Sequence, residues 1–250
     1  MESTDPLTKG TPGTDPLKHD SLTNDPLKHD PLTHDPLTNG PLAIDKLLDH
    51  VQETPARLGR TRLISVDGPA GSGKTTLADR IAARAEARGL HTLVLHMDDL
   101  YEGWDGAIRG FGLLRDHVLK RLADGREGRY RRYDWHRGAY AELHVVPVTL
   151  DLLIVEGVTS NDRDADPYQS LRIWIETSNE VRLDRGIDRD GEALRDHWLE
   201  WMRWERDHFA IENSRQRAHV IVDGDPTAPH STDTELVTKS VNLTQDSAAS

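Results

Sequence analysis

The sequence predicts an α/β domain with a five-stranded parallel sheet that helices cover on both faces. Strand and helix signals alternate between residues 45 and 226, as in parallel sheets with helical crossovers. The first strand signal also leads into a glycine-rich turn that is followed by apolar residues at helical spacing. The five expected strands are residues 63–66, 92–96, 152–155, 172–175 and 219–222.

The composition is consistent with one such domain. The chain has 250 residues, of which 36% are hydrophobic, and this is enough for one domain-sized core. There is no apolar run of membrane-spanning length, and the first residues lack the basic and apolar regions of a secretory signal. We therefore expect a cytoplasmic protein that does not bind membranes. The absence of cysteine excludes disulfides, thiolate metal sites and a cysteine nucleophile.

The net charge of −12 is distributed unevenly along the chain. Residues 1–44 contribute −4 and residues 227–250 contribute −2, which leaves −6 for the segment between them. A domain with this balance lacks the basic surface of a nucleic-acid binder. We therefore interpret local arginine clusters as sites for small anions.

Both ends of the chain have the composition of disordered tails. Asp-Pro-Leu recurs with a five-residue period through most of residues 1–44, and proline at this spacing prevents a continuous helix. Three histidines of this repeat lie beside aspartates, which leaves open a weak metal site or a docking role. They are His19, His29 and His34. Residues 227–250 are rich in Ser, Thr and Asp and predict a second polar tail.

The glycine-rich turn is the strongest functional signal. Residues 68–75 fill every fixed position of the pattern G-x-x-x-x-G-K-S/T, and the strand and helix signals beside them disfavour an ordinary flexible turn. In such a loop, backbone N–H groups and the helix dipole face phosphates. We expect Lys74 to reach the β and γ phosphates and Thr75 to coordinate Mg²⁺. The predicted nucleotide-binding residues of the loop are Gly68, Ala70, Gly71, Ser72, Gly73, Lys74, Thr75 and Thr76.

Two later strands deliver carboxylates to the sheet edge that holds this loop. The second expected strand is followed by Asp98 and Asp99, and the third by Glu156. Asp98 is placed to accept a proton from an acceptor hydroxyl and to help hold a metal ion, whereas capping of a turn is the alternative for either aspartate. Glu156 is a candidate metal ligand, acting through water.

Arginines follow the fourth expected strand at helical spacing. Arg182, Arg185 and Arg189 share one face of the predicted helix. Three aligned arginines suit the oxygens of a triphosphate, while pairing with the neighbouring aspartates on a solvated face is the alternative. Their place after a phosphate loop favours a lid over the nucleotide.

A longer helix is expected at about residues 192–213. It carries Trp198, Trp201 and Trp204 at every third position. This spacing would suit a platform on which a ligand stacks, but large aromatic side chains at helical spacing more often bury area in the core or against a lid. We therefore favour packing.

Five segments occur in an order that is typical of one kinase family. They are residues 68–75, Asp98-Asp99-Leu100-Tyr101, Tyr133-Asp134-Trp135, Glu156-Gly157 and the arginine series from Arg182 to Asp190. In this order the chain resembles the uridine kinase and phosphoribulokinase group of P-loop kinases over about residues 60–226. The resemblance implies a P-loop kinase fold, the use of ATP and Mg²⁺, and transfer of the γ-phosphoryl group to a hydroxyl of a nucleoside-like acceptor.

The resemblance also implies roles for single residues. It selects Asp98 over Asp99 as the catalytic aspartate. It aligns Tyr133 with a tyrosine that contacts the base, and Trp104-Asp105 with a pair whose aspartate holds the ribose diol. The residues expected to contact the acceptor are Asp98, Tyr101, Trp104, Asp105, Tyr133, Asp134 and His136. Those expected to act in catalysis are Asp98, Lys74, Arg185 and Arg189, with Arg182 and Arg185 also contacting ATP and with Thr75, Asp98 and Glu156 as metal ligands.

Two departures from the family pattern concern the acceptor. The position of the family's base-reading histidine is Gly138, with His136 two positions earlier, and a His-Pro-Asp segment is missing. Losing one polar partner can change which substrate a pocket accepts. The sequence therefore leaves open an ATP-binding regulator or slow ATPase with a degenerate acceptor site, or a scaffold that recruits partners through its repeats. A homo-oligomer is also open.

Overall fold

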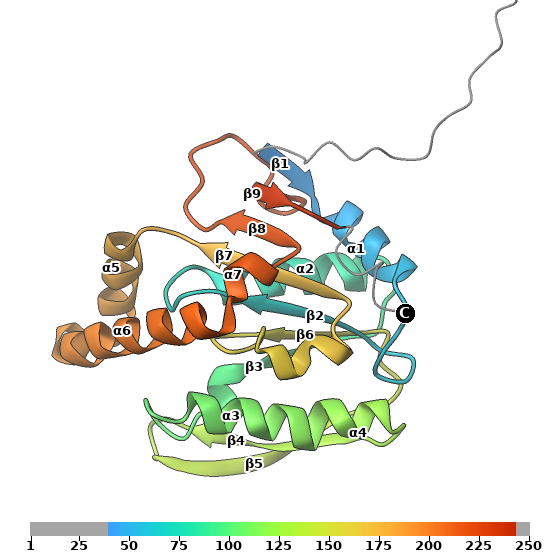
Figure 1. Ribbon diagram of the computed structural model, residues 1–250, viewed down its shortest axis with the longest axis horizontal. Coiled ribbons are helices and arrows are strands. Elements are labelled where there is room, and N and C mark those ends of the chain that lie inside the picture. The colour runs from blue at the N-terminus through green and yellow to red at the C-terminus, as the bar shows by residue number, and fades with distance from the viewer. Residues whose placement is uncertain (1–39, 244–250) are drawn as a thin grey trace, which may run out of the picture. The chain divides into compact units, whose positions relative to one another are not determined.

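The computed structural model of the protein describes residues 40–243. Its central element is a seven-stranded sheet (Figure 1). In sheet order, the strands are β1 (Gly40–Ala43), β9 (Glu235–Val241), β8 (Val220–Asp223), β7 (Leu171–Glu176), β2 (Arg62–Asp67), β6 (Leu152–Glu156) and β3 (Thr92–His96). The five strands from β8 to β3 are parallel, whereas β9 and β1 are added antiparallel at one edge. The predicted five-stranded parallel sheet is confirmed.

The two edge strands correct the predicted limits of the folded domain, 45 and 226. The C-terminal part of β9 pairs with β8, and its N-terminal part pairs with β1. Leu236 and Val241 of β9 are buried in the same core as the parallel strands. Their neighbours are mostly polar, so composition alone hid this strand. The remaining parts of both predicted tails, including the repeat and its histidines, lie outside the described residues.

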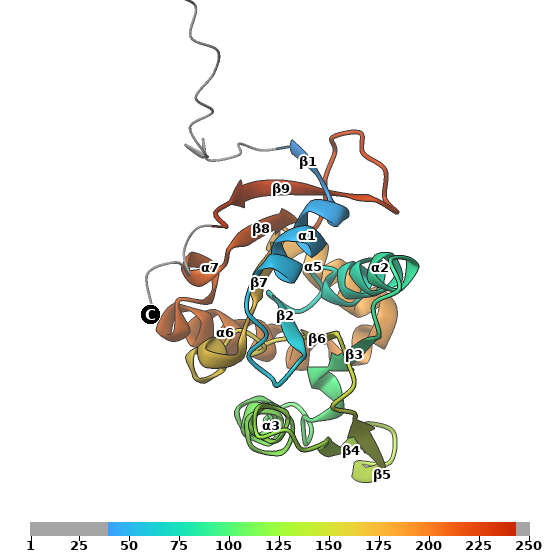
Figure 2. The same cartoon turned by 90° about the vertical axis from the view of Figure 1, so that its right-hand side faces the viewer.

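Helices cover both faces of the sheet (Figure 2). On one face, α1 (Ile44–Glu53) and α2 (Lys74–Ala87) contribute to a core with β2, β6, β7 and β8. On the other face, α3 (Ala107–Leu114) continues through a π-helical segment (Arg115–Leu119) into α4 (Lys120–Ala123), beside the hairpin of β4 (Gly128–Asp134) and β5 (Ala139–Val146). Adjacent residues of β2 point to opposite faces and both are buried, as for Leu63 and Ile64. This explains why the parallel strands are apolar throughout.

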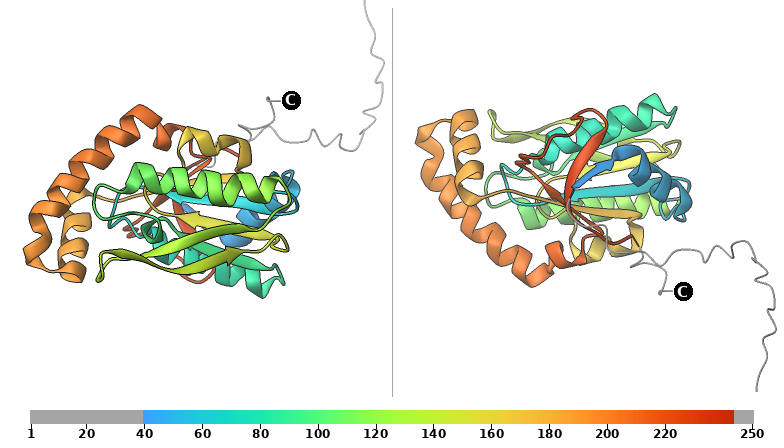
Figure 3. Two further views of the ribbon diagram at one scale, coloured as in Figure 1. Left: turned by 90° about the horizontal axis from the view of Figure 1, so that it is seen from below. Right: turned by 90° about the horizontal axis from the view of Figure 1, so that it is seen from above.

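Two helices lie beyond the end of the sheet at which β2, β6 and β7 finish (Figures 1 and 3). α5 (Asn179–Asp190) starts with the hydroxyl of Ser178 accepting the N–H of Val181. A 3₁₀ turn (Glu192–Leu194) leads into α6 (Arg195–Glu212), which ends at Asn213 in the left-handed conformation. The expected helix at 192–213 is therefore confirmed, with its first turn in 3₁₀ form. Three short helical elements complete the described part of the chain, η1 (Met97–Asp99), η3 (Arg163–Tyr168) and α7 (Ser214–Arg217).

Between residues 40 and 243, none of the helices combines the length and the apolar character that a membrane crossing requires.

Candidate active site

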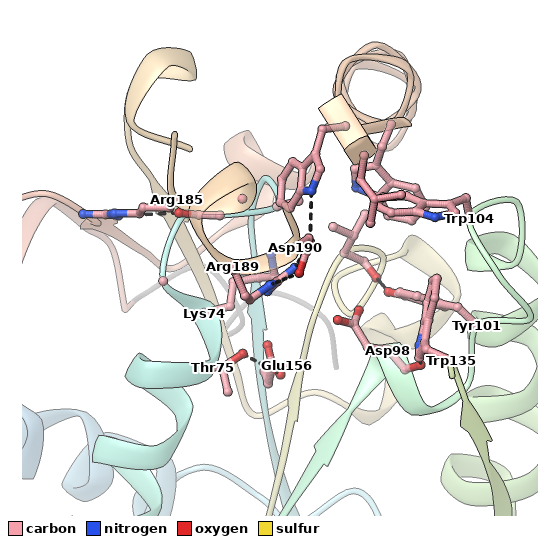
Figure 4. Close-up of a pocket in the computed structure, with 18 of the residues that line it drawn as sticks. Lys74, Thr75, Asp98, Tyr101, Trp104, Trp135, Glu156, Arg185, Arg189 and Asp190 are labelled. Atoms are coloured by element: carbon pink, nitrogen blue, oxygen red, sulfur yellow. Dashed lines mark hydrogen bonds and ion pairs between the residues drawn. The ribbon is translucent and has the colours of Figure 1, made fainter. Parts of the chain in front are cut away.

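A cavity of about 820 Å³ opens at the carboxyl ends of the parallel strands. Its walls come from the glycine-rich loop, the residues after β3 and β6, the β4–β5 turn, α5 and α6. Figure 4 shows Lys74 and Thr75 on one side of it and Trp104 and Tyr101 on the other, with Asp98 between them. We name these two sides the donor end and the acceptor end.

Most of the predicted nucleotide-binding residues lie at the donor end. The cavity is lined by Ala70, Gly71, Gly73, Lys74, Thr75, Thr76 and Arg185, but not by Gly68, Ser72 or Arg182. The Nζ of Lys74 donates hydrogen bonds to the carbonyl oxygens of Gly68 at 2.9 Å and Pro69 at 3.1 Å. Because α2 begins at Lys74, the positive end of its dipole faces the cavity. The donor end is therefore suited to bind an anion.

Three side chains meet at one carboxylate oxygen beside the loop. The hydroxyl of Thr75 donates to Oε1 of Glu156 at 3.1 Å, and Nδ1 of His96 lies 2.6 Å from the same oxygen. This hydrogen bond raises the pKa of His96. Sequence reasoning missed His96, although the pairing of β3 with β6 places it opposite Glu156.

The oxygen atoms at this point suit Mg²⁺, which prefers carboxylate, hydroxyl and phosphate ligands. Within residues 40–243 there is no group of three or more His, Cys, Asp or Glu side chains arranged to hold a metal ion. Mg²⁺ usually needs only one or two carboxylates when substrate phosphates complete its shell. Thr75, Asp98 and Glu156 fit that type of site, with most ligands coming from the nucleotide and water.

Asp98 lies in the 3₁₀ turn that follows β3, between the two ends of the cavity. Its side chain is exposed and lines the cavity. Nearby protein atoms still desolvate the Asp98 carboxyl and raise its pKa, and the negative charge of Glu156 raises it further. Asp99 does not line the cavity.

The three arginines of α5 point in different directions. The Nη1 of Arg185 donates to the carbonyl oxygen of Gly224 at 3.1 Å, and its Nη2 donates to Asp225 at 2.8 Å. Arg189 lines the cavity and donates two hydrogen bonds to Asp190, at 2.7 and 2.9 Å. The alternative of pairing with a neighbouring aspartate thus applies to Arg189.

The position of Arg182 differs from the expectation that it contacts ATP. Its side chain is buried outside the cavity and forms an ion pair of 2.5 Å with Glu205 of α6. Helical spacing places the three arginines on one face of α5, but it does not show that α6 covers the first of them. No sequence pattern indicates Glu205, because the contact joins segments that are far apart in the chain.

Aromatic rings form the acceptor end. Trp104 stacks on His197 with ring centroids 5.8 Å apart. It also packs edge to face against three other indoles, at 5.9 to 6.3 Å, namely those of Trp135, Trp198 and Trp201. Trp198 and Trp201 are buried as expected for packing, yet both also line the cavity, whereas Trp204 does not. The expected packing of these two side chains is thus confirmed, and part of each also reaches the cavity wall.

The predicted acceptor residues divide into two groups. Asp98, Tyr101, Trp104 and His136 line the cavity, while Asp105, Tyr133 and Asp134 do not. The carboxylate of Asp134 accepts the N–H groups of His136 and Arg137, both at 3.0 Å, and so caps the hairpin turn. Tyr133 packs edge to face on Trp135, and Asp105 is exposed in the turn before α3. The structure thus brings together the aromatic acceptor residues and Asp98 but not the predicted ribose contact.

Comparisons with known proteins support a P-loop kinase fold. The sequence profile of the Phosphoribulokinase / Uridine kinase family matches residues 107–228. A uridine kinase of Leuconostoc citreum (strain KM20) is 26% identical over 182 residues, which are 64% of this chain and 86% of that protein. A solved structure described as a possible uridine kinase from Bacillus stearothermophilus has a TM-score of 0.53 and 20% sequence identity, covering 71% of this chain and 96% of that chain, and shares the fold. The chain thus has the P-loop kinase fold and is similar to the phosphoribulokinase and uridine kinase family.

Proposed function

We propose that the protein transfers the γ-phosphoryl group of ATP to a hydroxyl group of a nucleoside-like acceptor. One observation carries this proposal: a single cavity joins the glycine-rich loop to an aromatic wall, with Asp98 between them. A phosphate-binding loop alone would suit any nucleotide-binding protein. A carboxylate at the border with a second, ring-lined compartment is what a phosphotransferase with an alcohol acceptor needs.

In the proposed reaction, the acceptor hydroxyl lies against Asp98. Its oxygen attacks the γ phosphorus, the bond from that phosphorus to the bridging β-phosphate oxygen breaks, ADP leaves, and the hydroxyl proton passes to the Asp98 carboxylate. Because its pKa is raised, the ionised Asp98 is a stronger proton acceptor than an ordinary aspartate.

Cationic side chains of the donor end offset the charge of the transferred group. Lys74 and Arg189 both line the cavity. For the role proposed for Arg185, its guanidinium has to exchange Asp225 for a phosphate oxygen, since these two side chains now form an ion pair. Thr75, Asp98 and Glu156 would hold Mg²⁺, which would neutralise phosphate charge when bound.

The aromatic wall supports an acceptor that carries a flat ring. Within residues 40–243, neither Trp104 nor Trp201 donates a hydrogen bond from its indole N–H, although both line the cavity. Each therefore offers an apolar face and an unused donor to a ligand. His136 adds a polar group on the same side. These features suit a base more than a simple polyol.

A regulator or slow ATPase with a degenerate acceptor site is the second candidate. It is favoured by Gly138 at the position of the base-reading histidine and by the location of Asp105 and Tyr133 outside the cavity. The retained Asp98 argues against it, since a pure binding module needs no proton acceptor at this point.

ADP formation measured with a panel of acceptors tests the proposal. The panel contains nucleosides, pantothenate-like alcohols and sugar phosphates, each added to the protein with ATP and Mg²⁺. We expect nucleosides to stimulate ADP release and to appear as phosphorylated products by mass spectrometry. ATP binding without stimulation by any acceptor would favour the regulator, and stimulation only by another class would reassign the acceptor.

A further inference from the structure

A buried ion pair reaches the phosphate loop from the helices above it. Oε2 of Glu205 accepts the backbone N–H of Ala70 at 2.8 Å, and Oε1 of the same carboxylate accepts Nη1 of Arg182 at 2.5 Å. Nη1 of Arg182 also donates to the carbonyl oxygen of Ala70 at 3.0 Å. Both backbone polar groups of one loop residue are thus bound by a single ion pair, which we name the Ala70 clamp.

The clamp is shielded from solvent. Glu205 is 1% exposed and Arg182 is 4% exposed. Burial raises the pKa of Glu205, while the charge of Arg182 opposes that rise. Taking two charges out of water is costly unless their remaining hydrogen-bonding groups are also satisfied. Here the loop backbone and Asn179, which accepts Nη2 of Arg182 at 2.7 Å, provide most of those partners, while Nε of Arg182 is buried without one among the described residues.

The next loop residue is fixed from the same side. A methyl group on Gly71 would lie 2.6 Å from the carbonyl oxygen of Arg182, so the loop backbone touches that of α5. Gly71 also has a φ of +78°, which favours glycine. Ala70 and Gly71 both line the cavity at the donor end. Contacts with α5 and α6 therefore fix these two residues on the side that faces away from the cavity. Their other side lines the donor end.

We propose that Glu205 and Arg182 are positioning residues that hold the phosphate loop in its nucleotide-binding shape. This inference rests on the proposed function, because it assumes that the loop binds ATP. A loop that is ordered before binding loses less conformational entropy when the nucleotide arrives, and affinity rises accordingly. Arg182 thus contributes to ATP binding through the loop, and not by touching a phosphate.

An apolar replacement of the pair tests the clamp. Arg182→Met combined with Glu205→Leu keeps similar volumes, and such replacements of buried ion pairs often preserve stability. They leave the N–H and carbonyl of Ala70 without these partners. We expect the dissociation constants of MgATP and MgADP, measured by calorimetry, to rise about 10- to 100-fold. Loss of the residues that orient metal ligands has effects of this size. The acceptor KM at saturating ATP should stay close to that of the wild type.

His208→Gln is the matched control. His208 lies one turn further along α6 and makes a buried contact of 2.8 Å with Asp162, and neither residue lines the cavity or bonds to Ala70. This variant should lose stability in thermal unfolding followed by circular dichroism but keep its MgATP affinity. Glu205→Gln supplies a milder variant: it retains an oxygen for Ala70 and should weaken MgATP less than the double replacement does.

The outcomes separate the two proposals. A folded double variant that binds MgATP as tightly as the wild type would overturn the clamp and leave the proposed function intact. Equal weakening of MgATP in the His208→Gln control would also overturn it, because any damage to α6 would then suffice. Failure of the wild type itself to bind MgATP would overturn the proposed function, and the clamp with it.

Discussion

The donor end of the cavity is built on hydrogen bonds to the backbone, whereas the acceptor end is built on ring packing. At the donor end, Lys74 binds two carbonyl oxygens and Glu205 binds an N–H group of the same loop. At the acceptor end, Trp104 contacts four other rings and makes no hydrogen bond within the described chain. Backbone contacts require glycine and lysine at fixed spacing, but ring packing tolerates many arrangements. The donor end can therefore be recognised by a sequence motif, whereas the acceptor end shows only an enrichment in aromatic residues.

The border between the two ends gives the largest expected effect. Asp98→Asn removes the proton acceptor and should lower kcat by about two to four powers of ten, with MgATP affinity nearly unchanged. Steady-state kinetics and calorimetry measure the two quantities. Asp99→Asn is the control, because its carboxyl lies outside the cavity. Near-normal turnover in Asp98→Asn would exclude this residue as the base.

A substitution at the donor end should have the second largest effect on the reaction rate. Lys74→Met removes the cation proposed to face the phosphates and should lower kcat/KM for ATP by about two to three powers of ten, as for other preorganised charge-stabilising groups. The acceptor should still bind, which quenching of tryptophan fluorescence can follow. If Lys74→Met turned over ATP and acceptor normally, the loop would not be the donor site.

A substitution at the acceptor end should have a smaller effect, and this effect should be on the acceptor and not on ATP. Trp104→Ala removes one face of the aromatic wall and should raise the acceptor KM about 10- to 100-fold, since stacking on an aromatic ring contributes about 1 to 3 kcal/mol. The KM for ATP should change little. Trp174→Phe is the control, because Trp174 packs on Phe209 outside the cavity. Equal effects on both substrates would mean that Trp104 supports the whole fold.

A buried carboxyl next to the loop is expected to affect stability and not turnover. Asp67 is fully buried at the end of β2 and accepts the N–H groups of Gly68 at 2.7 Å and Asn161 at 3.1 Å. Burial raises the pKa of Asp67 from 3.8 to about 7.

At pH values between 3.8 and about 7, Asp67 binds a proton in the folded protein but not in the unfolded chain. The contribution of Asp67 to stability is therefore complete below about pH 4 and is lost as the pH rises towards 7, at up to about 1.4 kcal/mol per pH unit. Asp67→Asn should remove this slope from the free energy of unfolding, measured with urea at a series of pH values. Parallel curves for the variant and the wild type would show that Asp67 does not titrate in this way.

The contrast between the two ends also explains which features could be predicted from the sequence alone. The parallel strands and the phosphate loop were predictable, because apolar runs and glycine spacing are local properties of the chain. β9 was not, since most residues around Leu236 and Val241 are polar, and these two side chains are buried only because β9 pairs with β1 and β8. Glu205 was not either, because its partner Ala70 is 135 positions away.

At the acceptor end, resemblance to a family was the main guide. It selected Asp98 over Asp99 and identified Trp104, and both residues line the cavity, but it also selected Asp105, which is exposed outside it. Turn geometry decides such positions, and neither composition nor spacing encodes it. The roles of these residues, the cytoplasmic location and a homo-oligomeric state stay predictions.

The contact between α5 and α6 has a consequence for the order of events in the site. A methyl group on Gly186 would lie 2.5 Å from the Trp198 ring, so no side chain separates the two helices there. Arg189 and Trp198 are joined through Asp190, which accepts hydrogen bonds from both. Any movement of this helix pair would therefore carry the arginines and the tryptophans together. Enclosing ATP and enclosing the acceptor would then be one event, which would protect the γ-phosphoryl group from water until both substrates are present.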